Sequence, residues 1–150
     1  FALLRKTRPA RLILIGEGPE KSNLKQLVEQ HKLEVDVSMP GFVSNPYVYF
    51  RQSSIFVLSS LWEGLPTVLI EALACGTRII STDCPSGPKE ILENGQWGVL
   101  VPVNDIFSLA EQMSNLLDQP KPQTNSSAWK QFTIGNSTKE YETLINEMLE

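Results

Sequence analysis

The sequence predicts an α/β protein with a Rossmann-like doubly wound parallel sheet of about five to six strands and helices on both faces. Short apolar runs alternate along the chain with segments whose apolar residues recur at helical spacing. Most of these runs end at glycine, proline or a polar residue, as buried parallel strands do before a connecting helix. The length of 150 residues is that of about one domain with its own core.

The first third of the chain predicts three strands and two helices. Residues 11–15 are an apolar run followed by glycines, and residues 34–39 alternate apolar and polar side chains, so both are expected to be strands. Between them, residues 21–32 carry apolar side chains at helical spacing. A short helix is expected over residues 47–52, after an Asn-Pro pair, and the third strand over residues 55–59.

The middle of the chain predicts two more strands and two helices. A helix is expected to open near Pro66 and to end before Gly76, because proline suits the first turn and glycine the residue past the end. Residues 78–82 and 98–101 are apolar runs of strand type, and a short helix is expected between them over residues 87–93.

The last third predicts helices and a polar connection. A helix is expected over residues 107–117, with Asn104 or Asp105 as its cap. Residues 119–135 are polar and loop-like in composition. A final helix from about residue 139 to residue 149 has one apolar face.

Composition excludes several classes of protein. Apolar residues make up 41% and charged residues 20%, as in an ordinary soluble domain, and the net charge of −4 argues against a general nucleic-acid surface. Cys75 and Cys84 lack C-x-x-C spacing and suggest reduced thiols in the cytoplasm. No apolar run approaches the roughly 20 residues that span a bilayer, and no His, Asp or Cys cluster suggests a metal site.

Two carboxylates frame the most informative stretch of the chain. Glu63 lies in the expected loop after the third strand, and Glu71 lies eight positions later inside the following helix. The N–H groups of residues 65–68, Pro66 excepted, are expected to be unpaired at the helix start and to attract an anion such as a diphosphate. Since a carboxylate does not favour phosphate, the two glutamates are expected to accept hydrogen bonds from sugar hydroxyls. This pattern predicts a nucleotide-sugar site.

The stretch resembles the E-x7-E signature of the retaining glycosyltransferases of family 4, which have the two-domain GT-B fold. Residues 16–19, 41–43 and 83–92 resemble three further blocks of that family in the same order. The similarity covers roughly residues 10–118 and matches only the carboxyl-terminal, donor-binding half of such an enzyme. It implies a nucleotide-sugar-binding domain over residues 1–118, with the N-terminal acceptor domain absent. Residues 119–150 would then be a linker and a C-terminal helix that packs on or crosses from the domain.

The resemblance also implies roles for individual residues. Glu63 would be the catalytic residue that holds hydroxyls of the donor sugar, and Glu71 would accept hydrogen bonds from both ribose hydroxyls. The loop at Gly16 and Gly18 would lie beside the phosphates and the base, and Val43 would pack on the nucleobase. The implied substrate-binding set is completed by residues at the helix start: Gly64, Leu65, Pro66, Thr67 and Val68.

The family's chemistry implies a substrate, an acceptor and a location. The donor would be a nucleotide sugar, expected to be UDP-linked, with no further cofactor and no metal. A saccharide or lipid-linked acceptor would bind through the missing N-terminal half, and transfer would retain the anomeric configuration. The basic pair that neutralises the diphosphate in the family has no matching motif here, so this chain is expected to bind weakly and to transfer nothing alone. The full-length protein would be cytoplasmic, with a peripheral place at the inner face of the membrane.

Three alternatives stay open from the residues. A nucleotide-sugar 2-epimerase uses the same scaffold, and its donor-half motifs overlap with those quoted above. A non-enzymatic α/β binding module would want an acidic cluster after the first strand, where only Glu17 stands. An NAD-dependent dehydrogenase is disfavoured, because Lys21 or Ser22 stands where the third glycine of the dinucleotide fingerprint belongs. Trp62 is expected to pack beneath the loop.

Overall fold

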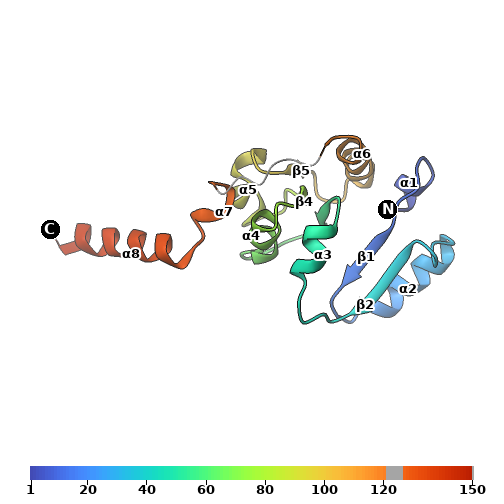
Figure 1. The fold of residues 1–150 in the computed structure, drawn as a ribbon, viewed down its shortest axis with the longest axis horizontal. Coiled ribbons are helices and arrows are strands. Elements are labelled where there is room, and N and C mark those ends of the chain that lie inside the picture. Colours follow the sequence, from blue (N-terminus) through green and yellow to red (C-terminus); the bar gives the residue numbers. More distant parts are fainter. Residues whose placement is uncertain (121–126, 150) are drawn as a thin grey trace.

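The computed structural model of the chain describes residues 1–120 and 127–149, and within them the predicted α/β Rossmann-like fold is confirmed (Figure 1). The strands are β1 Leu12–Ile15, β2 Val37–Gly41, β3 Phe56–Leu58, β4 Ile79–Thr82 and β5 Val99–Val101. The helices are α1 Ala2–Arg5, α2 Lys21–Gln30, α3 Tyr47–Gln52, α4 Thr67–Ala74, α5 Pro88–Ile91, α6 Ile106–Leu117, α7 Ser127–Lys130 and α8 Ile134–Leu149, with a 3₁₀ turn, η1, at Glu93–Gly95.

The five strands form two parallel sheets, and this corrects the expectation of one continuous sheet. One sheet pairs β1 with β2, and the other has the order β3-β4-β5. The register between β1 and β2 shifts between Ile13 and Ile15, opposite the part of β2 that contains Pro40, which has no N–H to donate. Strands β1 and β3 do not pair with each other. Each therefore has one edge that no described strand covers.

Strand β4 is the centre of the larger sheet, and all four of its residues are buried. Successive side chains of a strand point to opposite faces, so Ile79 and Ile80 enter two different cores. Ile79 packs in the core that α4 and α5 cover, and Ile80 packs with Met113 of α6 and Leu4 of α1. Helices therefore cover both faces of this sheet, as predicted.

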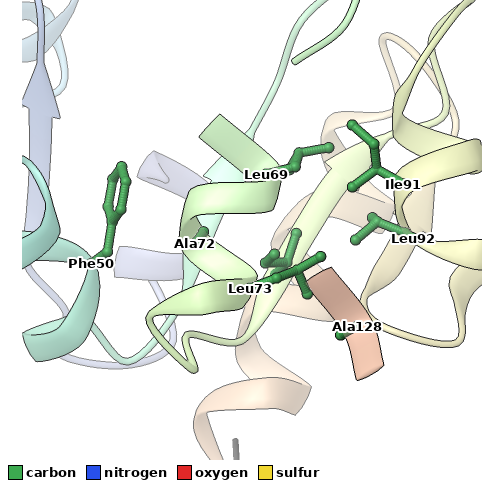
Figure 2. Packing of buried hydrophobic residues seen from close by; sticks show 8 residues of the cluster. Phe50, Leu69, Ala72, Leu73, Ile91, Leu92 and Ala128 are labelled. Carbon is green, nitrogen blue, oxygen red and sulfur yellow. The ribbon is translucent and has the colours of Figure 1, made fainter. Parts of the chain in front are cut away.

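Helix α4 is held by one buried face. Leu69, Ala72 and Leu73 recur at helical spacing, and Figure 2 shows them facing Phe50 of α3, Ala128 of α7 and the α5 region. Leu69 and Ala72 have no exposed surface. This packing fixes the orientation of α4. The opposite side of the helix is not part of the core and can carry polar side chains.

The ends of several elements differ from the expectations. Helix α3 has the expected bounds, whereas α8 begins at Ile134 and α7 occupies part of the stretch that was expected to be loop, so that expectation is wrong for residues 127–130 and 134–135. Residues 121–126 of the expected loop lie outside the described residues. Helix α1 was not foreseen. Figure 1 shows α8 extending away from the rest of the chain, and none of its described residues is buried.

In the part of the chain that the structure describes, no helix has the length and apolar character that crossing a membrane requires.

Candidate functional site

Two loops that follow adjacent parallel strands meet at the start of α4. The loop after β3 contains Glu63 and Gly64, and the loop after β4 contains Pro85 and Gly87. The N–H of Glu63 donates to the carbonyl oxygen of Pro85 at 3.4 Å. Gly87 has a φ of +94° and lies so close to Pro66 that a side chain at position 87 would collide with the proline ring. The loop after β4, which belongs to the block at residues 83–92, therefore packs against the loop that carries Glu63.

The Glu63 carboxylate is half-buried and held by a hydroxyl. Ser60 Oγ donates to Glu63 Oε1 at 2.6 Å. The carbonyl oxygen of Ser60 in turn accepts from Thr82 Oγ1 at 2.6 Å, and Thr82 is a buried residue of the central strand β4. The orientation of Glu63 is thus tied to the most buried strand of the protein. Ser60 was not among the residues predicted from the sequence, although a hydroxyl three residues before the signature glutamate is a signal that could have identified it.

The start of α4 keeps part of the donor set that the sequence predicts. Pro66 is the N-cap residue, and no side chain caps the helix. The N–H of Thr67 donates to the carbonyl oxygen of Leu65 at 2.8 Å, so the expectation that this N–H is unpaired is wrong: the turn at Pro66 folds it inward. Among the described residues, the N–H groups of Leu65 and Val68 have no hydrogen-bond partner. Two donors therefore remain for an anion.

Glu71 lies one turn along α4 from Thr67, on the side away from the buried face. It is half-buried, and in the described parts of the chain its carboxylate makes no hydrogen bond and no ion pair. Side chains on a helix lean toward its N-terminus, the end at which the N–H groups of Leu65 and Val68 lie. A half-buried carboxylate without a partner among the described residues is available to accept hydrogen bonds from a polar ligand.

The loop after β1 forms a second polar centre. Gly16, at φ +118°, donates its N–H to the carbonyl oxygen of Gly41 at 2.9 Å. Gly41 has a φ of +82°, and a side chain there would collide with the Glu17 carboxylate. Lys21 Nζ contacts Glu17 Oε1 at 2.7 Å, and this hydrogen bond lowers the pKa of the Glu17 carboxyl. Nothing lies within 4 Å of where a Gly18 side chain would begin, so the backbone there is open to a ligand.

The structure brings together only part of the predicted set. Glu63, Gly64, Leu65, Pro66, Thr67, Val68 and Glu71 lie along one loop and one helix. Gly16 and Gly18 follow β1, and the half-buried Val43 follows β2. Within residues 1–120 and 127–149, no hydrogen bond or ion pair links these three to the segment 63–71. The two groups belong to two different sheets.

Several apolar side chains around the site face solvent. Trp62 is 77% exposed and Leu65 59% exposed, so the expectation that Trp62 packs beneath the loop is wrong. Phe42, beside Val43, is also exposed. The short loop after β3 places Glu63 inward, and it leaves its neighbour Trp62 on the outside.

We also looked for metal ligands. The described residues contain no group of three or more His, Cys, Asp or Glu side chains that could hold a metal ion.

Comparison with known proteins identifies relatives of this architecture. The family model "Glycosyl transferases group 1" matches residues 1–131. An uncharacterized glycosyltransferase of Methanocaldococcus jannaschii is 46% identical over 83 residues, which are 55% of this chain and 20% of the relative. The N-acetyl-alpha-D-glucosaminyl L-malate synthase of Bacillus anthracis is 31% identical over 99% of this chain and 40% of the relative.

A third relative names a lipid-linked acceptor. It is the Campylobacter jejuni N-acetylgalactosamine-N,N'-diacetylbacillosaminyl-diphospho-undecaprenol 4-alpha-N-acetylgalactosaminyltransferase, which is 34% identical over 80% of this chain and 33% of the relative. The chain thus spans between a fifth and two fifths of the length of these three relatives.

Solved structures share the fold. The apo form of the lipopolysaccharide outer core galactosyltransferase WaaB superposes with a TM-score of 0.84 at 24% identity, over 98% of this chain and 43% of that one. Anabaena HepE in complex with UDP superposes with a TM-score of 0.81 at 23% identity, over 97% of this chain and 43% of that one.

Proposed function

The chain belongs to the group 1 glycosyl transferases, and on that premise we propose that it is the nucleotide-sugar-binding half of a family 4, GT-B glycosyltransferase. The observation that carries the proposal is the unpaired, half-buried carboxylate of Glu71 on the helix at whose start two N–H groups are free. Such a segment offers acceptors for hydroxyl groups and donors for an anion. A nucleoside diphosphate sugar presents both kinds of group.

In the proposed complex the start of α4 receives the diphosphate. The N–H groups of Leu65 and Val68 donate to phosphate oxygens, and the dipole of α4 adds attraction for negative charge. As the donor's glycosidic bond breaks, negative charge grows on the leaving diphosphate, so these donors stabilise the transition state more than the ground state. Glu71 accepts hydrogen bonds from the ribose hydroxyls, which satisfies its carboxylate.

Glu63 is the proposed contact to the donor sugar. Its Oε1 is occupied by the Ser60 hydroxyl, and this leaves Oε2 and the remaining lone pairs for sugar hydroxyls. Because Ser60 is fixed through Thr82 to β4, the carboxylate is oriented before the donor arrives. A preoriented acceptor places the anomeric carbon without the loss of side-chain freedom that a mobile glutamate would suffer.

The finer parts of the proposal rest on the family resemblance and on relatives. We propose a UDP-linked hexosyl or N-acetylhexosaminyl donor. A structural neighbour was solved with UDP, and two relatives are named for N-acetylhexosaminyl chemistry. Retention of the anomeric configuration and metal-independent transfer are proposed from the resemblance alone. The acceptor, a saccharide or a lipid-linked saccharide, would bind to the other half of the enzyme at the cytoplasmic face of the membrane.

A titration tests the proposal. The chain is titrated with UDP, GDP and ADP by calorimetry, as the wild type and as Glu71→Ala. We expect saturable binding of one nucleotide, tightest for UDP, and a loss of about tenfold in affinity for Glu71→Ala, because a charge-assisted hydrogen bond is worth about 1.5–3 kcal/mol. The matched control is Glu111→Ala, which removes an exposed carboxylate of α6 and should leave the affinity unchanged.

Two results would contradict the proposal. One is equal binding by wild type and Glu71→Ala, which would remove the role of Glu71. The other is the absence of nucleotide binding at millimolar concentration in both this chain and a longer protein that carries the other half. If the longer protein alone binds, the site is assigned correctly but needs groups from outside this chain.

A further inference from the structure

Trp62 differs from the other two tryptophans of the chain in its surroundings. Trp97 and Trp129 pack against the core around α4, and their indole nitrogens are buried. The Trp62 side chain is 77% exposed, although tryptophan in folded proteins is covered over most of its surface on average. An exposed indole offers a large apolar surface on which a ligand can bind.

The backbone on both sides of Trp62 is fixed. Two residues earlier, the carbonyl oxygen of Ser60 accepts a hydrogen bond from the Thr82 hydroxyl at 2.6 Å. One residue later, the N–H of Glu63 donates to the carbonyl oxygen of Pro85 at 3.4 Å. The Glu63 carboxylate also accepts a hydrogen bond from the Ser60 hydroxyl. The indole is thus presented from an anchored loop, so a ligand that binds to it does not first have to order the backbone.

Apolar side chains extend the exposed surface on either side of Trp62. Leu61 and Leu65 belong to the same loop and are each 59% exposed. Residues 52–77 contain no lysine or arginine, so the loop offers no cation to an anionic lipid surface. Three side chains also bury far less than the roughly 800 Å² per partner of a stable protein–protein interface. The surface therefore suits a small, uncharged ligand that is apolar on one face.

A pyranose ring is a ligand of this kind. Its hydroxyl groups lie around the edge of the ring, and its C–H groups form an apolar face. The negative face of an aromatic ring attracts such C–H groups, and indole has the largest aromatic face among the amino acid side chains. The proposed function brings two sugar rings next to each other, because the donor sugar passes to a saccharide acceptor.

The position of Trp62 next to Glu63 favours the acceptor ring over the donor ring. Consecutive Cα atoms lie about 3.8 Å apart, so the indole is within reach of a sugar that adjoins the one held by Glu63. The Glu63 carboxylate turns inward to Ser60, whereas Trp62 faces solvent. The donor sugar would occupy the inner side of the loop, and the acceptor that attacks it would arrive from the solvent side.

We infer that Trp62 is a stacking platform for an uncharged sugar ring of the acceptor. The inference rests on the proposed function and deepens it, because part of the acceptor site would then belong to the same half of the enzyme that binds the donor. The indole has no acid or base chemistry to contribute. Its role is to orient the acceptor hydroxyl toward the anomeric carbon of the donor sugar.

An NMR titration of the chain with sugars tests the inference. The probes are the methyl glycosides of glucose, galactose and N-acetylglucosamine, added in the presence of UDP. The three tryptophans give three indole N–H signals. We expect at least one probe to shift the Trp62 signal saturably, and no probe to shift the signals of Trp97 and Trp129, whose nitrogens are buried. A Trp62 signal that no probe shifts, up to the solubility limit of each sugar, would overturn the inference.

Variants at position 62 separate stacking from a general apolar contact. Saturation-transfer NMR, which detects the ring protons of the bound sugar, compares Trp62→Ala, Trp62→Leu and Trp62→Tyr. We expect sugar affinity to fall about five- to tenfold for alanine and leucine, and less than about threefold for tyrosine, which keeps a flat aromatic face. The matched control is Phe107→Ala, which removes an aromatic side chain that is 71% exposed on α6 and should leave sugar binding unchanged. Wild-type sugar affinity in Trp62→Leu would overturn the inference.

The affinity for UDP separates this inference from the proposed function. Trp62→Ala should bind UDP as tightly as the wild type, because the proposed nucleotide contacts do not include the indole. Failure of the wild type to bind UDP counts against the proposed function, whatever the sugars do. Normal UDP binding without a Trp62 response to sugars contradicts this inference alone. If Trp62→Ala weakens binding of a UDP-sugar but not of the methyl glycosides, the indole lies over the donor ring and the inference is wrong.

Discussion

The two sheets of this protein differ in how completely the chain itself buries them. In the β3-β4-β5 sheet all four residues of β4 are buried, and helices pack on both faces. Beside the β1-β2 sheet, α2 has no buried residue, and Ile13 of β1 is half-exposed. Both sheets are parallel and built from similar apolar runs. The difference shows that strand composition decides what can be buried, whereas the helices that pack against a strand decide what is buried.

The comparison also separates the two parts of the candidate site. Glu63 and Glu71 belong to the well-packed sheet, and their positions follow from contacts within this chain. Gly16, Gly18 and Val43 belong to the other sheet, whose packing is incomplete. Four predictions test this contrast, in order of the size of the expected effect.

The largest effect is expected from matched leucine truncations, one in each region. Leu69 of α4 is fully buried, so Leu69→Ala should lower the free energy of unfolding by about 2–5 kcal/mol. Leu27 of α2 is 48% exposed, and Leu27→Ala should lower it by less than about 1 kcal/mol. Chemical denaturation followed by circular dichroism measures both. Equal losses would show that the two regions are equally packed.

Two glycines provide the next contrast. Gly87→Ala places a methyl group against Pro66 at a φ of +94°, and it should cost about 1–3 kcal/mol of stability and displace the loop at Glu63. Gly18→Ala meets no atom within 4 Å, and it should leave stability within about 0.5 kcal/mol of the wild type. Thermal unfolding compares the two variants. A neutral Gly87→Ala would mean that the two loops do not lock together in solution.

A smaller effect is expected from the hydroxyl that holds Glu63. Ser60→Ala removes the 2.6 Å hydrogen bond, and it should weaken nucleotide-sugar binding by about 0.5–1.5 kcal/mol while affinity for the free nucleotide stays the same. Ser59→Ala, an exposed neighbour, is the control. Calorimetry with UDP and with a UDP-sugar separates the two affinities. An equal loss for both ligands would assign Ser60 to general loop stability.

The smallest effect concerns the exposed pair after β1. Lys21 lowers the folded-state pKa of Glu17, so the pair's stabilisation is present above the carboxyl's ordinary pKa and is lost as the pH falls through the lowered value. Lys21→Met should return the pKa of Glu17 toward its ordinary value, with little change in stability at neutral pH, since the pair is exposed. A carboxyl NMR titration measures this. The Asp105 carboxyl, whose pKa is lowered by Ser108 in the other region, should not respond.

Much of the fold followed from sequence pattern, and the failures have physical causes. Strand type was predictable for all five strands because apolar runs and their flanking glycines are local signals. Sheet continuity was not, because the grouping of strands into sheets is a long-range feature that local apolar runs do not record. The helix α1 was missed because four residues are too few to show a period. The helical stretch from residue 127 was missed because its apolar residues, Ala128, Trp129 and Phe132, are too few to show a sustained helical period.

The candidate site was predictable to a similar degree. The motif located Glu63 and Glu71, since their spacing along the chain is itself the signal. The tie from Ser60 to Thr82 could not be seen, because it joins residues 22 positions apart, one in the loop after β3 and the other at the end of β4. The inward N–H of Thr67 was missed because the backbone turns tightly at Pro66 (φ −73°, ψ 81°) and bends this N–H back to the carbonyl oxygen of Leu65. The local sequence shows which hydrogen-bonding groups a segment contains. The folded backbone decides which of these groups keep no partner within the protein.

The interlocked loops after β3 and β4 have a consequence for protein engineering. Because Gly87 sits against Pro66 and the carbonyl oxygen of Pro85 receives the Glu63 N–H, neither loop can be redesigned alone without disturbing the other. A graft intended to change donor preference should exchange residues 59–66 and 83–88 together as one cassette. Libraries that vary one loop at a time would sample mostly misfitting combinations.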